Sequence, residues 1–126
     1  MNKKKIMIVD DEPDVAFTVE HNLKNFSNEY EVIISESGKK CLDSLKKGII
    51  PDLILLDIMM PDMNGWEVFN KLKENSLWEN IPIIFLTARV DRTAENAGSF
   101  LGDDYIEKPY DPKDLIKRIE KVLNKK

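Results

Sequence analysis

Short apolar runs alternate along this chain with stretches in which apolar residues recur every three or four positions. Runs that are apolar on both faces are typical of buried strands, whereas the longer period is typical of helices that cover a core. The runs lie at 6–9, 32–34, 53–56 and 83–86, and a shorter one lies at 105–107. Pro82 stands at the start of the fourth run, where its missing N–H does least harm to a strand.

A helical pattern follows each of these runs. Ser37 and Asn64 are expected to cap the second and third helices, and Asp111 followed by Pro112 is a strong start signal for the last one. A weaker helix is expected over about 91–100. The apolar residues at helical spacing are Val15, Val19, Leu23 and Phe26 in the first helix, Cys41, Leu42 and Leu45 in the second, Val68, Phe69 and Leu72 in the third, and Leu115, Ile116, Ile119, Val122 and Leu123 in the last.

The alternation of strands and helices predicts an α/β fold. Consecutive β–α units whose strands are buried on both faces imply a parallel sheet with right-handed crossovers. No linker, repeat or low-complexity stretch interrupts the 126 residues, so we expect a single domain over 1–126.

Polar residues gather where the predicted strands end. Asp10 and Asp11 follow the first run, Asp57 the third, Thr87 the fourth and Lys108 the fifth. The carboxyl ends of parallel strands share one edge of a sheet, and open α/β sheets bind their ligands at that edge. We therefore expect these residues, which are far apart in the sequence, to meet in one pocket.

Three carboxylates in one pocket need a cation. Asp10, Asp11 and Asp57 would repel one another, and Lys108 supplies only one positive charge. An all-oxygen site of this kind suits Mg²⁺ better than zinc or copper. We expect Asp57 to bind the metal directly, Asp10 or Asp11 to bind it partly through water, and the backbone carbonyl of Met59 to supply a further oxygen.

Such a site suits phosphoryl transfer to a carboxylate. A carboxylate such as that of Asp57 can attack a phosphoryl group and form an acyl phosphate, and the transfer depends mainly on positioning and charge neutralisation. Mg²⁺, the Lys108 ammonium, the Thr87 hydroxyl and the backbone N–H near Ala88 can each bind a phosphoryl oxygen. The same groups would later admit water for hydrolysis.

Four segments carry a more specific signal. They are 6–12 (IMIVDDE), 57–65 (DIMMPDMNG), 86–89 (LTAR) and 104–110 (DYIEKPY). In this order and spacing they resemble the signature blocks of response-regulator receiver domains of two-component systems, and the resemblance covers essentially the whole chain. It implies a flavodoxin-like (βα)5 fold like that of the chemotaxis regulators, a three-layer sandwich with a five-stranded parallel sheet of order 2-1-3-4-5.

The resemblance assigns a role to each residue of the predicted site. Asp57 matches the phospho-accepting aspartate, and Asp10 and Asp11 match the acidic metal pair. Met59 matches the position whose carbonyl binds the metal. Lys108 matches the lysine that contacts the phosphoryl group. The implied cofactor is therefore Mg²⁺.

The resemblance also implies how the signal leaves the site. Thr87 and Tyr105 match the switch pair, whose movement reshapes the face formed by the helix at 91–100, the last strand and the last helix. The implied partners are a histidine kinase or phosphotransfer protein on one side, and a downstream protein or a second copy of the chain on the other.

The chain departs from the family pattern at a few positions. Leu101-Gly102 stands where the family often has Gly-Ala, and Tyr110 stands where Phe is commoner, which adds a hydroxyl. A cis bond between Lys108 and Pro109 is expected. Met59 and Arg89 flank the path of attack, and their bulk predicts slow self-dephosphorylation. We expect no activity on other substrates, so the protein is not interpreted as an enzyme.

The composition limits the partners and the compartment. With 19 Lys+Arg against 23 Asp+Glu, the net charge of −4 argues against nucleic acid as a direct partner. The only cysteine, Cys41, cannot form an internal disulfide, which fits a reducing compartment. The apolar run at 6–9 is too short for a signal peptide or a membrane span. We therefore expect a cytoplasmic protein without a membrane partner.

Several alternatives compete with the receiver interpretation or with parts of it. Asp10 and Asp11 can instead cap the first helix, and Tyr105 can be a core residue without a switch role. A haloacid-dehalogenase-like phosphatase also uses an aspartyl nucleophile, but that class places a second Asp two residues later, where this chain has Met59. A further alternative is a receiver that acts only as an interaction module, and the intact set of site residues around Asp57 argues against it.

Several other residues are assigned no chemistry. Asp62 and Asp104 are interpreted as turn and solvent residues, and His21 as an exposed helix residue. Trp66 and Trp78 are expected to be partly buried against the fold.

Overall fold

The computed structural model describes residues 3–88 and 103–124 of the chain. The elements, in chain order, are β1 (Lys4–Val9), α1 (Pro13–Phe26), β2 (Tyr30–Ser35), α2 (Gly38–Lys46), β3 (Leu53–Leu56), α3 (Gly65–Lys73), β4 (Ile83–Thr87), β5 (Asp104–Glu107) and α5 (Pro112–Leu123). All five predicted strands are confirmed, each within one or two residues of its predicted bounds. The helix predicted at 91–100 lies outside the described residues.

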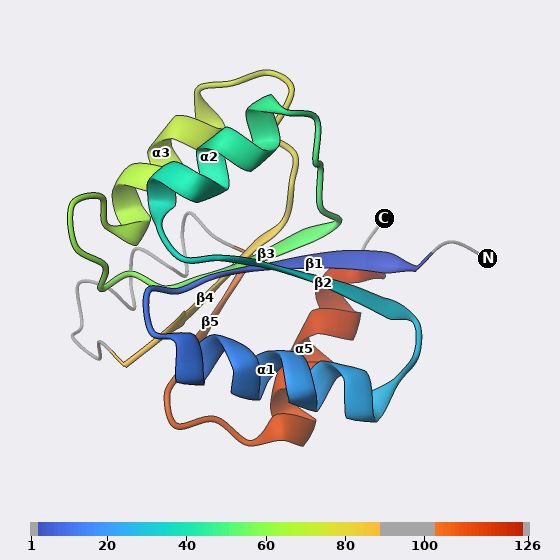
Figure 1. The fold of residues 1–126 in the computed structure, drawn as a ribbon. Coiled ribbons are helices and arrows are strands. Elements are labelled where there is room, and N and C mark those ends of the chain that lie inside the picture. The colour runs from blue at the N-terminus through green and yellow to red at the C-terminus, as the bar shows by residue number, and fades with distance from the viewer. Residues whose placement is uncertain (1–2, 89–102, 125–126) are drawn as a thin grey trace.

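The strands form one parallel sheet of order β2-β1-β3-β4-β5, which confirms the order that the family resemblance implied. Helices α2 and α3 cover one face of the sheet and α1 and α5 the other, so the described elements build three layers (Figure 1). This arrangement brings the carboxyl ends of β1, β3, β4 and β5 to the same edge, because all the strands run in one direction.

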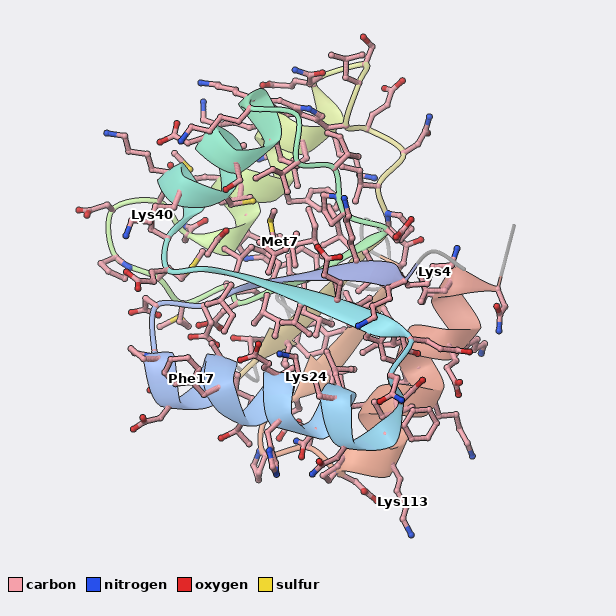
Figure 2. All side chains as sticks on the ribbon, turned by 45° about the vertical axis from the view of Figure 1, so that its right-hand side comes forward. Lys4, Met7, Phe17, Lys24, Lys40 and Lys113 are labelled. Carbon is pink, nitrogen blue, oxygen red and sulfur yellow. The ribbon has the colours of Figure 1, made fainter. Side chains whose placement is uncertain are left out.

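Each face of the sheet carries its own apolar cluster. Successive residues of a strand point to opposite faces. Met7 accordingly joins the cluster under α2 and α3 (Figure 2), and its neighbours Ile6 and Ile8 join the cluster under α1 and α5. Cys41 is fully buried in the first cluster, as its position in the helical pattern predicted. The central strands are thus held from both sides, which gives the site a rigid base.

The predicted helix starts are confirmed by their caps. The Ser37 side chain accepts a hydrogen bond from the backbone N–H of the third residue after it. Asn64 and Glu67 form a reciprocal capping box at the start of α3. Asp111 caps α5, with Pro112 at its first position. These caps satisfy N–H groups that the helix itself leaves unpaired.

Three sequence interpretations outside the site are corrected by the structure. Phe26 is 54% exposed, because it is the last residue of α1 and lies past the buried stripe, in which Ala16 takes part instead. Asp104 is a strand residue rather than a solvent residue, since it begins β5 and pairs with Arg118 at 2.9 Å. Trp66 is half-buried as expected, whereas Trp78 is buried.

None of the helices among the described residues has the length and apolar character that crossing a bilayer requires.

Candidate functional site

The sheet itself positions three of the predicted site residues. Asp10, Asp57 and Lys108 each come directly after a strand, and each donates a backbone hydrogen bond that extends the sheet. The N–H of Asp10 reaches the last carbonyl of β2 at 3.1 Å, that of Asp57 reaches the last carbonyl of β1 at 3.0 Å, and that of Lys108 reaches the Thr87 carbonyl at 2.9 Å. Their Cα positions are therefore fixed by strand pairing rather than by free loops.

An acidic cluster forms at this edge. One carboxylate oxygen each of Asp10, Asp11 and Asp57 lies within 4.8 Å of the other two. Asp10 and Asp57 are each only 3% exposed, whereas Asp11 is partly open to solvent. The predicted convergence of these three carboxylates is confirmed.

Lys108 brings the one positive charge seen among these carboxylates in the described part of the chain. Its Nζ lies 2.8 Å from Oδ2 of Asp10 and 4.0 Å from Oδ2 of Asp57. The Lys108 side chain is 14% exposed, so the ion pair with Asp10 is well shielded from water. With three carboxylates against one ammonium, the site keeps a negative charge.

The Asp57 carboxyl has a raised pKa. Burial is the main cause, and the neighbouring Asp10 charge adds to it. The Lys108 charge, a hydrogen bond from the Thr87 side chain and the backbone N–H of Met59, 3.4 Å from Oδ1, act in the opposite direction. Because burial and repulsion outweigh these contacts, the ionised Asp57 carries an unfavourable energy that a bound cation would relieve.

The donor set fits Mg²⁺. All the side-chain donors are oxygens, and the partly exposed Asp11 leaves a path for the waters that Mg²⁺ retains. Both oxygens of Asp10 already accept hydrogen bonds, from Glu12 N–H at 2.9 Å and from Lys108 at 2.8 Å. This suits contact between Asp10 and an ion through water.

The bond from Glu12 also bears on the capping alternative. Glu12 is the N-cap residue of α1 and makes no side-chain capping bond itself. Asp10 accepts the Glu12 N–H, so it does help to hold the start of the helix. The cap and the acidic cluster are therefore two roles of the same carboxylate.

Gly65 explains how the Asp57 loop is held, a feature that the sequence analysis missed. Its N–H donates to the Ile58 carbonyl at 2.9 Å. A Cβ at this position would meet the carbonyl oxygen of Asp57 and would lie 2.8 Å from Cα of Ile58. Only glycine lets the start of α3 approach this closely, so the approach itself fixes the loop after β3.

The predicted switch pair lies on neighbouring strands. Thr87 is the last residue of β4 and is fully buried, which places it inside the strand rather than past its end as predicted. Tyr105 of β5 is in register with Phe85, and Thr87 lies two residues further along β4. Thr87 and Tyr105 therefore share one face of the sheet. Their movement stays a prediction.

The remaining predicted site positions lie at the rim. Ala88 is exposed in a bend directly after β4. The Met59 side chain is 53% exposed. Arg89 lies outside the described residues. The Lys108–Pro109 peptide bond is cis, as expected.

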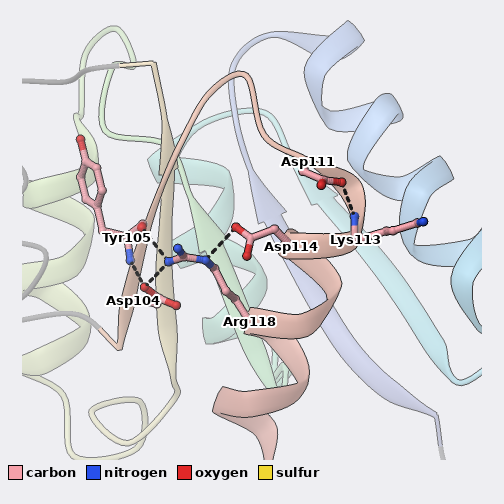
Figure 3. A network of polar contacts seen from close by, with 6 residues as sticks. All are labelled: Asp104, Tyr105, Asp111, Lys113, Asp114 and Arg118. Carbon is pink, nitrogen blue, oxygen red and sulfur yellow. Dashed lines mark hydrogen bonds and ion pairs between the residues drawn. The ribbon is translucent and has the colours of Figure 1, made fainter.

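Two sets of polar contacts were not predicted, one at the loop that carries Lys108 and one at the start of β5. Nδ2 of Asn22 donates to the Tyr110 hydroxyl at 2.8 Å, and the only signal in the sequence was Tyr in place of Phe. Arg118 of α5 donates to Asp104 at 2.9 Å, to Asp114 at 2.9 Å and to the Tyr105 carbonyl at 3.3 Å (Figure 3). The four-residue spacing of Asp114 and Arg118 is a signal that could have indicated part of this network.

A parallel five-stranded sheet with an acidic cluster and a lysine at its carboxyl edge defines the receiver class of signalling domains. The comparison of sequences agrees, because the family model described as response regulator receiver domain matches residues 6–120. The chain belongs to the response regulator receiver family, whose members work with histidine kinases.

The chain is similar to several known proteins. It is 35% identical over 123 residues to the alkaline phosphatase synthesis transcriptional regulatory protein PhoP of Bacillus subtilis, covering 97% of this chain and 49% of PhoP. It is 38% identical over 122 residues to the response regulator ArlR of Staphylococcus saprophyticus, covering 96% of this chain and 53% of ArlR. The chain thus spans about half the length of the curated relatives it matches.

Solved structures show the same fold. The chemotaxis protein CheY4 of Vibrio cholerae has a TM-score of 0.84 at 27% identity, over 95% of this chain and 98% of that one. The signal receiver domain of a signal transduction histidine kinase from Syntrophus aciditrophicus has a TM-score of 0.84 at 30% identity, over 95% of this chain and 89% of that one. Since PhoP is named a transcriptional regulatory protein, these relatives give no support to the expected absence of a nucleic-acid partner.

Proposed function

We propose that this protein is a phosphorylation switch in which Asp57 accepts a phosphoryl group from a histidine kinase or a phosphotransfer protein. One observation carries the proposal: the Lys108 ammonium lies within a buried acidic cluster, 2.8 Å from Asp10 and 4.0 Å from Asp57. A carboxylate nucleophile, a divalent-ion site and an ammonium at one edge are the parts that phosphoryl transfer to an aspartate requires.

The transfer uses the side chains in distinct ways. An Asp57 oxygen attacks the phosphorus of a phosphohistidine and forms an O–P bond. The P–N bond breaks, and its electron pair stays on the imidazole nitrogen, which takes up a proton. The Lys108 ammonium, the Thr87 hydroxyl and the Ala88 N–H bind the phosphoryl oxygens.

The metal site completes this arrangement. Asp11, Asp57 and the Met59 carbonyl would hold Mg²⁺, with Asp10 in contact through water. When bound, the ion neutralises the charge that gathers on the transferring oxygens. The raised pKa of Asp57 and its unfavourable ionised state support a need for such a cation.

The proposed output is a change of surface rather than turnover of another substrate. Thr87 would turn toward the phosphoryl group, and Tyr105 would move inward. The face that includes β5 and α5 would then bind a downstream protein or a second copy of the chain, in the cytoplasm. The exposed Met59 side chain at the rim supports slow loss of the phosphoryl group, because it can hinder the approach of water.

The test is labelling with acetyl phosphate, read by intact mass. We expect the wild type to gain the mass of one phosphoryl group with Mg²⁺ and to gain none with excess EDTA. Asp57→Asn should gain none in either case. Asp62→Asn is the matched control, because Asp62 is exposed in the same loop at φ 67°, a conformation that Asn tolerates. Labelling of Asp57→Asn at the wild-type rate would contradict the proposal.

A further inference from the structure

The loop that carries Lys108 is fastened at both of its ends. At its start, the Lys108 N–H donates to the Thr87 carbonyl at 2.9 Å. At its end, the Asp111 carbonyl accepts from Leu115 N–H at 3.0 Å in the first turn of α5. Between these points the loop depends on its side chains, since Pro109 has no N–H to donate.

A side-chain bond ties the middle of this loop to α1. The Tyr110 hydroxyl accepts a hydrogen bond of 2.8 Å from Nδ2 of Asn22, a residue 88 positions earlier in the chain. Among the hydrogen bonds between residues 3–88 and 103–124, this is the one that joins the loop to α1. The Tyr110 ring packs against the apolar cluster under α1 and α5. This packing orients the side chain so that its hydroxyl meets Asn22.

The contact between the loop and α1 is incompletely filled by side chains. A surface pocket of about 460 Å³ lies between them, and its lining includes Val15, Thr18 and Asn22 of α1 as well as Lys108 and Tyr110 of the loop. Where side chains leave a hollow, few van der Waals contacts oppose a shift of the loop. The Asn22–Tyr110 bond therefore carries a larger share of the restraint than it would in a filled interface.

The restraint matters because of what Lys108 does. Its ammonium is placed 2.8 Å from Asp10 and 4.0 Å from Asp57 by a backbone that lies two residues before Tyr110. Transfer reactions that rely on positioning lose rate when a reacting or charged group is misplaced by about 1 Å. A loop that is free to move away from α1 would move the ammonium away from the carboxylates.

We propose that Asn22 and Tyr110 are a positioning pair for Lys108, which holds the β5–α5 loop against α1 so that the ammonium stays aligned with Asp57. This inference rests on the proposed phosphorylation of Asp57. It assigns a role to the hydroxyl by which Tyr110 differs from the commoner Phe.

The experiment measures the rate of acetyl-phosphate labelling and, separately, the affinity for Mg²⁺ alone. Tyr110→Phe and Asn22→Ala should each slow labelling by roughly three- to tenfold, the range expected for one hydrogen bond. The Mg²⁺ affinity should not fall, because the acidic cluster is anchored to β1 and β3 and an ammonium that moves away competes less with the ion. Asn22→Asp should label faster than Asn22→Ala and close to the wild-type rate, because its carboxylate can accept a hydrogen bond from the Tyr110 hydroxyl.

Combination with Lys108→Ala separates a positioning role from a structural one. If the pair acts through Lys108, Tyr110→Phe should not slow labelling further in the Lys108→Ala background. Tyr30→Phe and Asn25→Ala are matched controls, since Tyr30 lies in the same apolar cluster and Asn25 is exposed on α1. Both should label at the wild-type rate.

Two outcomes would overturn the inference. One is wild-type labelling by Tyr110→Phe while Lys108→Ala is slow, and the other is an equal further loss in the Lys108→Ala background. Failure of the proposed function looks different, because the wild type itself would then take no Mg²⁺-dependent label.

Discussion

The Lys108 ammonium is closer to Asp10 than to Asp57, at 2.8 Å against 4.0 Å. Asp10 is almost fully buried, so Lys108 is its main compensating charge among the described residues. Before phosphorylation, then, Lys108 acts first as the partner of a metal-site acid. It would have to share its charge with the phosphoryl group once that group is attached to Asp57.

This geometry predicts opposite effects of Lys108→Ala on metal binding and on labelling. Without the ammonium, the carboxylates lose a competing cation, so Mg²⁺ should bind more tightly, by at least about tenfold because the Lys108–Asp10 pair is shielded from water. Labelling by acetyl phosphate should slow by more than tenfold, because a phosphoryl oxygen loses its ammonium. Isothermal titration calorimetry and the labelling rate measure the two effects. Weaker Mg²⁺ binding would show that Lys108 organises the acids instead.

Asp57→Asn is expected to stabilise the metal-free protein at neutral pH. The pKa of Asp57 is raised, chiefly by burial, so the folded state disfavours the ionised form. The contribution of Asp57 to stability is thus most favourable below the ordinary pKa of 3.8 and is lost as the pH rises through the raised value. The asparagine side chain in the variant does not ionise, so the variant does not lose stability in this way as the pH rises. Urea unfolding at pH 4 and pH 7 checks it, and the difference between wild type and variant should appear mainly at pH 7.

With Mg²⁺ present, the wild type should instead be more stable than Asp57→Asn at neutral pH. At an ion concentration about one hundred times the dissociation constant, binding stabilises the folded wild type by about 2.7 kcal/mol, and the variant should gain much less. Equal stabilisation of both proteins would place the ion elsewhere.

Gly65→Ala should disturb the loop that carries Asp57. The added methyl would meet the Asp57 carbonyl oxygen and the Ile58 backbone, neither of which can move like the end of a flexible side chain. We expect a loss of about 1–3 kcal/mol of unfolding free energy, together with slower labelling. Gly48→Ala is the control, because Gly48 has φ 93° with open space around it. It should lose about 1–2 kcal/mol without slower labelling. A normal labelling rate in Gly65→Ala would contradict the claim that the close approach of Gly65 positions Asp57.

Cys41 should be unreactive in the folded protein. The side chain is fully buried, and burial raises the pKa of the thiol to about 12. At pH 8 almost no thiolate is present, and no reagent can reach the sulfur. A thiol reagent such as DTNB should therefore react only as fast as the chain unfolds, and at once in denaturant. Rapid reaction without denaturant would mean that α2 opens locally.

The strand ends were the part of the site that could be predicted from the sequence. Asp10, Asp57 and Lys108 follow buried strands directly, and parallel topology forces such positions to one edge. Their meeting needed no knowledge of loop shapes. The helix caps could be predicted for a different reason: each cap depends only on residues close together in the chain.

The contacts between elements could not be predicted in this way. The Asn22–Tyr110 bond joins residues 88 positions apart and depends on how far α1 lies from the β5–α5 loop. Asp104 looked like a solvent residue until α5 brought Arg118 beside it. Phe26 continued a helical pattern but lies beyond the buried stripe of α1. In each case the contact or the exposure depends on the distance between packed elements. The spacing of apolar residues in the sequence does not give that distance.

The central claim is tested most directly by locating the phosphoryl group. After labelling with acetyl phosphate and Mg²⁺, borohydride reduction converts an aspartyl phosphate to homoserine, which tandem mass spectrometry of the digested chain can place at a single residue. We predict homoserine at position 57 alone, and its absence when EDTA replaces Mg²⁺. Homoserine at another aspartate, with residue 57 unmodified, would contradict the account.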